Sequence, residues 1–427
     1  MKNIWVFAIA IIIVGAIAAI AGIVFYGEWF GAPPAEEQRQ AEAPAHMPPA
    51  QTPPPQQPAG NGDVPPPVEP PEFVEKHPTT PRAILEYFLF TKMMDKNGAM
   101  RNEYSNGKYY VLAKTTGQLM EYALMTDNKE LFDKEFALLK NHFLANKYGV
   151  AYEKIWLDDY SPIENKSETE DNMRFMWVLY KADDKWPGNG YEEVGDAIAS
   201  KIIVYCTYQE ILSKGIVWDE NGYTVQTRMD VDDLRWEAMH NLSKEDKSGV
   251  WLRMLEKTTP LFLECQGGRD GPTGLFWQEV NLKTSRPEYP VGSDVCYTDH
   301  MLRAAMYFSD YKTTVPATAL HTRLENDWKR YGKISEAYHM EGLGTGNGRE
   351  IMEVYALMGR NEMRLIPARC DLAPQMLDRI LMEQITDESS VLFGSVSQNR
   401  KENGVEDDLD TLLFMIELEE KCGISTK

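Results

Sequence analysis

Residues 167–186, SETEDNMRFMWVLYKADDKW, decide the fold, because an acidic start runs directly into an apolar segment with helical spacing. Glu168, Glu170 and Asp171 lie immediately before the apolar residues. Carboxylates are favoured at such a place, since the first turn of a helix carries a partial positive charge. The stretch therefore predicts a buried helix near residues 170–183 with acids at its start.

The same helical period dominates the chain from residue 81 onward, and clear alternating strand patterns are scarce. The predicted helices lie near residues 84–94, 116–127, 128–144, 170–183, 191–214, 231–241, 248–265, 299–310, 317–331, 347–359, 372–386 and 406–421. Consecutive antiparallel pairs of these helices predict an all-α fold in which six hairpins close into an (α/α)6 barrel. A helical solenoid would also fit, although the chain has no regular internal repeat.

The N-terminal part of the chain has a different composition. Residues 4–26 are uncharged and almost wholly apolar, long enough to cross a bilayer as one helix, and Lys2 precedes them. The positive-inside tendency then leaves the N-terminus in the cytoplasm and the rest of the chain outside it. A cleaved signal peptide is the alternative, but its apolar region is usually shorter.

A Pro-rich segment follows, and its Pro, Ala, Gln and Glu residues predict an extended linker without a packed core. The predicted organisation is a cytoplasmic tip and transmembrane anchor over residues 1–28, a disordered linker over 29–81 and a helical domain over 82–427. We therefore expect a single-pass protein of the cell membrane whose large domain is extracytoplasmic.

Charge and cysteine usage exclude several classes of partner. The 427 residues carry a formal net charge of −21, which argues against nucleic acid because a phosphate backbone would be repelled. Five widely spaced cysteines show no metal-binding pattern, so buried free thiols, with room for one bridge, are expected. His240 and His300 also lack partners at metal spacing, and the sequence predicts neither a metal nor a cofactor.

Aromatic side chains gather in the polar loops between the predicted helices. A pyranose ring has an apolar face that packs on indole or phenol rings, so these loops predict a binding site for a carbohydrate polymer. The candidate sugar-stacking residues are Tyr109, Trp156, Tyr160, Trp277 and Tyr297.

Three segments resemble a known family. Residues 95–144 contain TTGQ and NKELFD, similar to a family opening with "SEGQ.YG" and "NDK..FD". Residues 169–172, TEDN, fall in the frame of the signature A-[ST]-D-[AG]-D, and SDVCYTDHMLRAA, residues 293–305, is similar to "YDA.RVPWR". In this order and spacing the chain resembles glycoside hydrolase family 8, the inverting endoglucanases and chitosanases of the six-hairpin glycosidase superfamily, over about residues 82–422.

The resemblance implies roles for individual residues. Inverting hydrolysis needs a protonated carboxyl at the leaving oxygen and an ionised carboxylate that holds water on the opposite face, roughly 6.5–9.5 Å away. The resemblance places Asp294 as the base and Glu170 in the central subsite, with Gln118 and Asp171 beside the sugar. A cap on the helix that follows is the structural alternative for Asp294.

The general acid is where the chain departs from the family. Thr116 stands at the position of the family's glutamate, and a threonine hydroxyl does not protonate a glycosidic oxygen at neutral pH. Glu121, in the helix after Gly117, and Glu103, in the preceding hairpin, are the candidates to replace it. An exposed or ion-paired structural role is the alternative for both glutamates.

Three functions fit these residues. The first is a membrane-anchored, extracytoplasmic hydrolase of a polysaccharide. The second is a glycan-binding protein of the cell envelope that keeps the cleft and has lost hydrolysis, as the threonine at the acid position suggests. The third is an (α/α)6 enzyme of another chemistry, such as a lyase.

Overall fold

The computed structural model describes residues 78–103, 108–268, 271–311, 314–340, 348–396 and 404–426. The described chain is mostly helical, and every predicted helix between residues 81 and 422 has a counterpart. The α-helices are α2 (Pro81–Tyr87), α3 (Ala113–Met125), α4 (Lys129–Leu138), α5 (Thr169–Lys185), α6 (Tyr191–Tyr205), α7 (Trp236–Glu245), α8 (Val250–Cys265), α9 (Thr298–Tyr311), α10 (Val315–Tyr331), α11 (Met352–Glu362), α12 (Ala373–Leu381) and α13 (Gly404–Cys422). Three further helical segments are η1 (Phe88–Met93), η2 (Leu139–Phe143) and η3 (Val231–Asp233).

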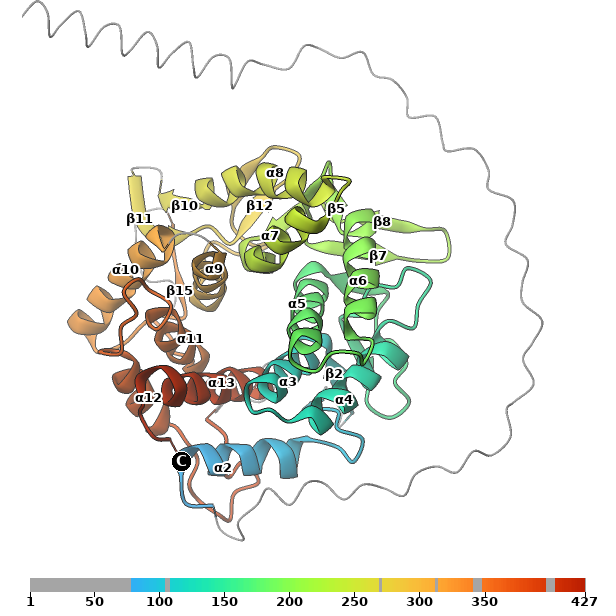
Figure 1. Cartoon of the computed structure of the whole chain (residues 1–427). Helices are drawn as coiled ribbons and strands as arrows, with labels where there is room; N and C mark the ends of the chain where they lie inside the picture. The colour runs from blue at the N-terminus through green and yellow to red at the C-terminus, as the bar shows by residue number, and fades with distance from the viewer. Residues whose placement is uncertain are drawn as a thin grey trace, which may run out of the picture. The chain divides into compact units, whose positions relative to one another are not determined.

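The helices form two concentric rings (Figure 1). In the inner ring α3, α5, α7, α9, α11 and α13 follow one another, each packing on the next, and α13 packs back on α3. Each remaining helix covers one of them from outside: α2, α4, α6, α8, α10 and α12 pack on α13, α3, α5, α7, α9 and α11, respectively. The predicted (α/α)6 barrel is therefore confirmed, and the closed ring excludes an open solenoid.

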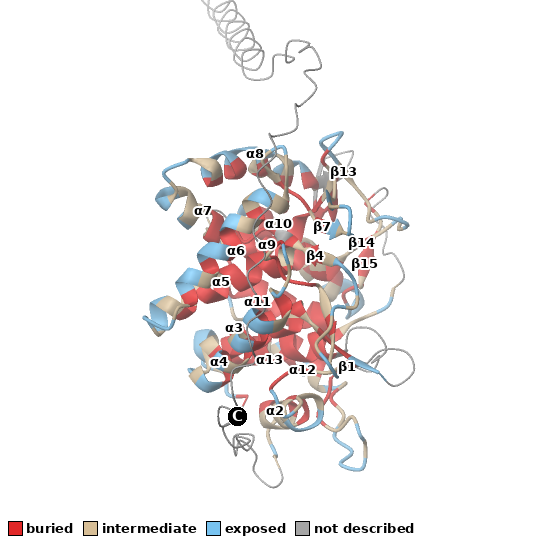
Figure 2. Ribbon diagram, turned by 90° about the vertical axis from the view of Figure 1, so that its right-hand side faces the viewer, coloured by how far each residue is buried: buried red, intermediate tan, exposed pale blue. Residues whose placement is uncertain are grey.

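Burial separates the two rings, as Figure 2 shows. Every residue of α11 is buried, whereas the buried side of α6 consists of Tyr191, Gly195, Ile198, Ala199 and Ile202. An inner helix contacts neighbours on all sides, while an outer helix has one apolar stripe.

Short strands lie in the connections that lead into the inner helices. The strands are β1 (Asn102–Glu103), β2 (Tyr109–Leu112), β3 (Lys154–Trp156), β4 (Lys166–Glu168), β5 (Thr207–Tyr208), β6 (Ile211–Leu212), β7 (Gly215–Trp218), β8 (Tyr223–Val225), β9 (Arg228–Asp230), β10 (Gln266–Gly268), β11 (Gly271–Phe276), β12 (Glu279–Asn281), β13 (Arg286–Glu288), β14 (Cys296–Tyr297) and β15 (Ala337–Tyr338). They pair in antiparallel sheets of two or three strands, such as β4–β7–β8, in which Ser167 faces Ile216. The expectation of an all-α domain needs this correction, because such short strands show no readable alternation.

Two helices differ from their predicted bounds for local reasons. The helix predicted over 191–214 ends at Tyr205, because β5 and β6 form a hairpin whose turn holds Gln209 and Glu210 at φ 53° and 63°. The helix predicted over 231–241 begins at Trp236, after the separate turn of η3. Both predicted helices were too long because they included apolar residues of the connecting segments, namely the β5–β6 hairpin and η3.

The predicted anchor over 4–26 and almost all of the predicted linker lie outside the described residues. Within the described ranges, no helix is long and apolar enough to cross a membrane. One disulfide joins Cys370 and Cys422, at the end of α13, while Cys206, Cys265 and Cys296 are free and buried.

Candidate active site

The six inner helices begin at the same end of the ring, which we call the mouth. Lys114, the second residue of α3, lies 2.6 Å from Glu406 in the first turn of α13, so neighbouring helices start side by side. Five of the six inner helices carry carboxylates in their first turn: Glu170 and Asp171 on α5, Glu237 on α7, Asp299 on α9, Glu353 on α11, and Glu406 and Asp407 on α13. These acids lie at the positive ends of their helices, and those of α5, α9 and α13 surround Lys114, whereas Glu237 is held by Trp177 and Lys181 further along α5.

Lys114 stands among three of these carboxylates, from three different helices. Its side chain is 20% exposed, and Glu406 contacts it directly. Burial and Arg303 lower the pKa of Lys114, but the negative charges of Glu406 and Glu170 outweigh them, and the net pKa lies above the ordinary value. Lys114 is therefore charged at neutral pH and holds acids of α5 and α13 together at the mouth.

Glu170 is the carboxylate of α5 in this group. Its side chain is 15% exposed, and the Arg174 guanidinium donates to Oε1 over 2.9 Å, one turn further along the helix. Burial raises the pKa of Glu170, but Lys114, Arg174 and Arg303 outweigh it and hold the pKa well below the usual range. Glu170 is therefore ionised and partly open to solvent.

Asp299 is the corresponding carboxylate of α9, and its side chain is 12% exposed. Arg303 donates to Oδ2 over 2.9 Å. Burial raises the pKa of Asp299, but the charges of His300, Arg303 and Lys114 lower it below the usual value. Asp299 is thus a second ionised carboxylate, acted on by the same lysine as Glu170.

His300 is placed between two aspartates. Nδ1 lies 2.7 Å from the buried Asp232 of η3, and Nε2 lies 3.7 Å from Oδ2 of Asp299. Burial lowers the pKa of His300, but Asp232 and Asp299 outweigh it and raise the pKa to about 9. We call Lys114, Glu170, Asp299, His300 and Glu406 the mouth cluster.

Below the mouth cluster, ion pairs run through the centre of the ring. Arg303 contacts Asp410 over 3.0 Å, Arg360 contacts Asp410, Glu121 and Glu417 over 3.3, 2.7 and 2.8 Å, and Arg174 lies 3.6 Å from Glu121. These pairs connect Asp299 to Glu170 through alternating acids and arginines. The axial network consists of Glu121, Arg174, Arg303, Glu353, Arg360, Asp410 and Glu417, all of them buried.

The structure places Asp294 apart from these buried acids. Asp294 is exposed in the loop before β14, and its main-chain oxygen lies 3.0 Å from Nδ1 of His339. It lies before a strand, so the helix-cap alternative does not apply, because β14 separates it from α9. Its loop leads to the mouth, but the aspartate that shares the surroundings of Glu170 is Asp299.

The region of the missing acid is closed. Thr116 and Gln118 are fully buried, and a side chain at Gly117 would meet Cδ of Arg174 at 2.4 Å. Arg174 therefore crosses α3 closely at Gly117, the residue after Thr116. No donor reaches the mouth from Thr116.

The structure describes the surroundings of one of the two replacement acids, Glu121. Glu121 accepts from Arg360 over 2.7 Å; burial raises its pKa, but Arg360, Arg235 and Arg174 outweigh burial and lower it. A carboxylate that is held ionised in this way has no proton to donate. The side chain of Glu103 lies outside the described part of the chain. Asp171 is buried, and burial together with Glu170 and Glu153 raises its pKa well above the ordinary value.

The predicted stacking residues occupy different loops. Tyr109 is exposed on β2, and Lys108 lies over the ring of Trp156 on the neighbouring β3. Tyr160 packs on His142 of η2, away from the inner helices. The rings of Trp277 and Tyr289 lie 4.7 Å apart.

Tyr297, on β14, lies directly before α9 and 6.4 Å from the ring of His300. The structure thus brings Tyr297 to the mouth cluster and leaves Tyr160 on the outside of the barrel.

Asp299, His300 and Arg303 are the residues that the sequence prediction missed. They belong to the segment CYTDHMLR, residues 296–303, where Asp299 and Arg303 stand one helical turn apart. The family pattern "YDA.R" has its arginine three residues after the aspartate, whereas Arg303 follows Asp299 by four, so the pattern does not single out Asp299. The available signal was an acid and an arginine one helical turn apart at the start of a predicted helix.

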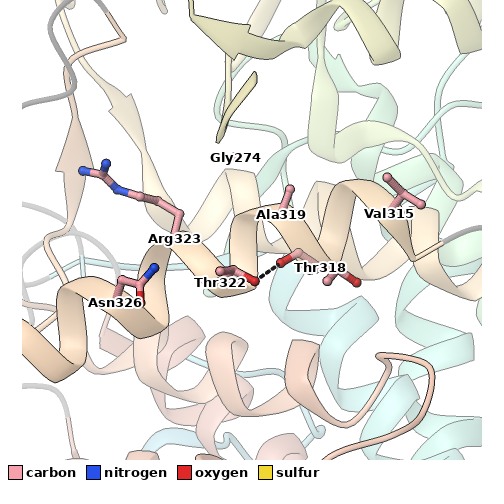
Figure 3. A pocket seen from close by; sticks show the side chains of 7 residues that line it. All are labelled: Gly274, Val315, Thr318, Ala319, Thr322, Arg323 and Asn326. Carbon is pink, nitrogen blue, oxygen red and sulfur yellow. Dashed lines mark hydrogen bonds between the residues drawn. The ribbon is translucent and has the colours of Figure 1, made fainter. Parts of the chain in front are cut away.

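A separate pocket of about 490 Å³ lies on the outer ring, beside α10 (Figure 3). Its seven described lining residues are Gly274, Val315, Thr318, Ala319, Thr322, Arg323 and Asn326, and Thr322 donates to the main-chain oxygen of Thr318 over 2.8 Å. This lining contains no carboxylate, so it offers no acid–base pair. Among the described residues, no three His, Cys, Asp or Glu side chains are grouped to hold a metal ion.

A ring of paired helices with acids at one end is the arrangement of the (α/α)6 glycosidases. The chain matches the model of glycosyl hydrolases family 8 over residues 89–345, more than half of its length, and it belongs to that family. Family membership implies glycoside hydrolase activity on polysaccharides.

Solved structures share the fold at low sequence identity. An α-amylase from Clostridium perfringens is 19% identical with a TM-score of 0.67, covering 79% of this chain and 97% of its own. PssZ from Listeria monocytogenes is 15% identical with a TM-score of 0.59, covering 80% and 97%. Endoglucanase Cel10 from Klebsiella pneumoniae, a family 8 glycosyl hydrolase, is 13% identical with a TM-score of 0.55, covering 79% and 99%. The comparison with curated sequences gives no match.

Proposed function

We propose that the chain is a membrane-anchored, extracytoplasmic glycoside hydrolase that cleaves a polysaccharide with inversion at the anomeric carbon. The observation that carries the proposal is the mouth cluster, where ionised, partly open carboxylates of two inner helices share one lysine. An ionised carboxylate beside a sugar can take a proton from water or stabilise positive charge at the anomeric carbon.

We assign the base to Asp299 and the central subsite to Glu170. Arg303 orients the Asp299 carboxylate, and neighbouring cations keep it deprotonated, as activation of water requires. Asp294, the candidate from the sequence resemblance, is exposed and lies five residues earlier in the loop that enters α9. The two aspartates are distinguishable by experiment, and Asp294 is the matched comparison for Asp299.

The extracytoplasmic location is part of the proposal. It is supported by the apolar run over residues 4–26 and by the Cys370–Cys422 disulfide, since such bonds persist mainly in oxidising compartments. The proposed organisation remains an anchor over 1–28, a linker over 29–81 and the catalytic domain over 82–427. Resistance of the domain to a protease added to intact spheroplasts would contradict this location.

A glycan-binding protein without hydrolysis is the second candidate. The observation that favours it is the buried Thr116, because a chain that has lost its family acid keeps a cleft without a proton donor. Such a protein retains affinity for a polymer and releases no product.

The test uses the full chain in detergent with a panel of polymers: mixed-linkage β-glucan, xylan, chitosan and starch. New reducing ends measure hydrolysis, and the first anomer released, followed by NMR, reports the stereochemistry. We expect one polymer to be cleaved with inversion, and Asp299→Asn to reduce the rate by about 10²–10⁴-fold, the usual contribution of a positioned general base. Asp294→Asn is expected to have a much smaller effect.

Every other result contradicts part of the proposal. If Asp294→Asn abolishes hydrolysis and Asp299→Asn does not, the base is Asp294. Retention on an immobilised polymer without new reducing ends identifies the glycan-binding protein. Neither binding nor cleavage of any polymer in the panel, nor of the cell's own surface polysaccharide, removes both candidates.

A further inference from the structure

The first turn of α13 lies directly beside the helix that has lost its acid. α13 packs on α3, and the 2.6 Å contact between Lys114 and Glu406 fixes the two helix starts next to each other. The sequence of this turn, GVEDDLD at 404–410, contains three consecutive acids. An acid from α13 can therefore approach the mouth where Thr116 of α3 does not.

Helical spacing shows which of these acids faces the centre of the ring. Asp410 bonds Arg303 and Arg360 of the axial network, so its side of α13 points inward. Glu406 and Asp407 stand four and three residues before Asp410, so both lie on this side of α13, one turn nearer the mouth. Asp408 points elsewhere, because it accepts from Ser395 Oγ over 2.9 Å and from the main-chain N–H of Val396 over 2.8 Å.

The surroundings of Asp407 differ from those of Glu406 and Asp299. Glu406 is held by the Lys114 ammonium. Asp407 is 9% exposed, and burial, followed by the charges of Asp408 and Glu406, raises its pKa well above the ordinary value despite Lys114. The pKa of Asp299 is instead shifted below its ordinary value. Two carboxyl groups whose surroundings push their pKa values apart are the pattern of an acid and a base in one site.

We propose that Asp407 is the catalytic proton donor of this hydrolase, supplied by α13 in place of the acid missing from α3. The inference rests on the proposed function and deepens it. Lys114 of α3 contacts Glu406, the residue before Asp407, over 2.6 Å, and its positive charge also acts on Asp299 of α9. α13 lies beyond residue 345, where the family match ends, so the match does not reveal the replacement.

The step balances without a cofactor. The Asp407 carboxyl gives its proton to the glycosidic oxygen as the bond from that oxygen to the anomeric carbon breaks, and the bonding electrons move to the oxygen. A water molecule attacks the anomeric carbon from the opposite face and passes a proton to Asp299. Asp407 is left ionised and Asp299 protonated, and exchange of protons with solvent restores both.

Asp407→Asn in the full chain tests the assignment, with the polymer that the wild-type protein cleaves as the first substrate. The second substrate is the 2,4-dinitrophenyl glycoside of the oligosaccharide it releases, whose leaving group needs no proton. We expect the rate on the polymer to fall by about 10²–10⁴-fold, the range for a lost general acid, and the rate on the dinitrophenyl glycoside to stay near that of the wild type. Glu237→Gln is the matched control and keeps its activity on both substrates, because this first-turn acid of α7 is held by Lys181 and Trp177 and does not act on Asp407.

The outcomes separate this inference from the proposed function. A wild-type protein that cleaves no polymer refutes the proposed function. A wild-type hydrolase whose Asp407→Asn variant keeps its rate on the polymer refutes the donor alone. An equal loss on both substrates, with an unchanged circular dichroism spectrum, assigns Asp407 to substrate binding and also refutes it. If Asp407→Asn does not fold, Asp407→Glu replaces it. If Asp407 is the donor, the rate of Asp407→Glu falls more on the polymer than on the dinitrophenyl glycoside, and equal falls refute the assignment.

Discussion

The mouth cluster and the axial network use the same residue types on the same helices and yet have different consequences. Glu170 and Arg174 are one turn apart on α5, and Asp299 and Arg303 are one turn apart on α9. In each pair the acid is partly open at the mouth, while the arginine is 1–2% exposed and reaches further acids along the axis. One helical turn therefore separates residues that are partly open to solvent from residues sealed inside the protein.

The difference follows from desolvation. A buried ion must be matched by several partners, because removing one partner leaves an uncompensated charge away from water. Arg360 accordingly meets three carboxylates. At the mouth, the side chains of Glu170 and Asp299 are 15% and 12% exposed, so we expect a change of charge there to cost the fold less than one in the axial network. The four predictions below test this division, beginning with the largest effect.

Arg360→Met is expected to lower the free energy of unfolding by about 3–5 kcal/mol, because it leaves Glu121, Asp410 and Glu417 buried without their shared cation. Urea unfolding followed by circular dichroism measures the loss. A variant as stable as the wild type would contradict the structural role of the axial network.

Glu170→Gln is expected to lower hydrolysis of the cleaved polymer by about 10²-fold, because it removes the negative charge beside the sugar. Its unfolding free energy should change less than that of Arg360→Met. The matched control is Glu237→Gln, since Glu237 is also the second residue of its helix but is held by Lys181 and Trp177. Equal losses of activity in the two variants would show that Glu170 contributes no more to hydrolysis than Glu237 does.

The pH dependence of stability tests His300. Its pKa in the folded protein, about 9, lies above the ordinary value, so its stabilisation is complete below pH 6.5 and is lost as the pH rises through 9. Asp232, Asp299, Arg303, Asp230 and Glu170 are the charged groups that act on it or are acted on by it. We expect the wild type to lose about 2 kcal/mol more than His300→Gln between pH 7 and pH 10.

Urea midpoints of both proteins at each pH give this difference directly. Comparing the two proteins removes the contribution of groups on which His300 does not act. Asp230, whose pKa burial raises to about 7 against the charge of Lys214, is also acted on by His300, so its contribution stays in the difference. Parallel curves for the two proteins would mean that His300 is not held charged by its aspartates.

The smallest effect is expected on the outer surface. Arg253 contacts Glu210 over 3.0 Å, with side chains 45% and 40% exposed, and solvent screens such an exposed pair so that it contributes little to stability. Arg253→Met should therefore change the urea midpoint only slightly. A loss comparable to that of Arg360→Met would show that burial does not decide the cost of breaking an ion pair in this protein.

The helices were predictable from the sequence because their apolar spacing is a local property. All of the predicted helical segments between residues 81 and 422 exist, and the errors concern ends, as at Tyr205 and Trp236. The acidic starts, such as Glu170 and Asp171, were readable for the same reason, since a helix dipole acts within one turn. The short strands were not readable, because two to four residues rarely show a period.

The site was predictable only in part. The sequence pointed to the segment around Asp294, but the geometry brings Asp299, five residues later, to the surroundings of Glu170. Glu121 is a candidate acid from its position after Gly117, and only the tertiary structure shows that it pairs with Arg360, 239 residues away along the chain. The roles of Asp294, Glu170 and the aromatic residues in substrate binding stay predictions until the variants are measured.

By itself, the sequence determined a chain of paired helices with carboxylates at their starts, because periodicity and helix dipoles act over a few residues. Closure of the ring decided everything else: which acids share Lys114, which are sealed by arginines, and which face the mouth. The physical reason is that the pKa of a charged side chain and its exposure to solvent depend on its burial and on its nearest partners. In this protein those partners come from helices that are neighbours in space and distant in sequence.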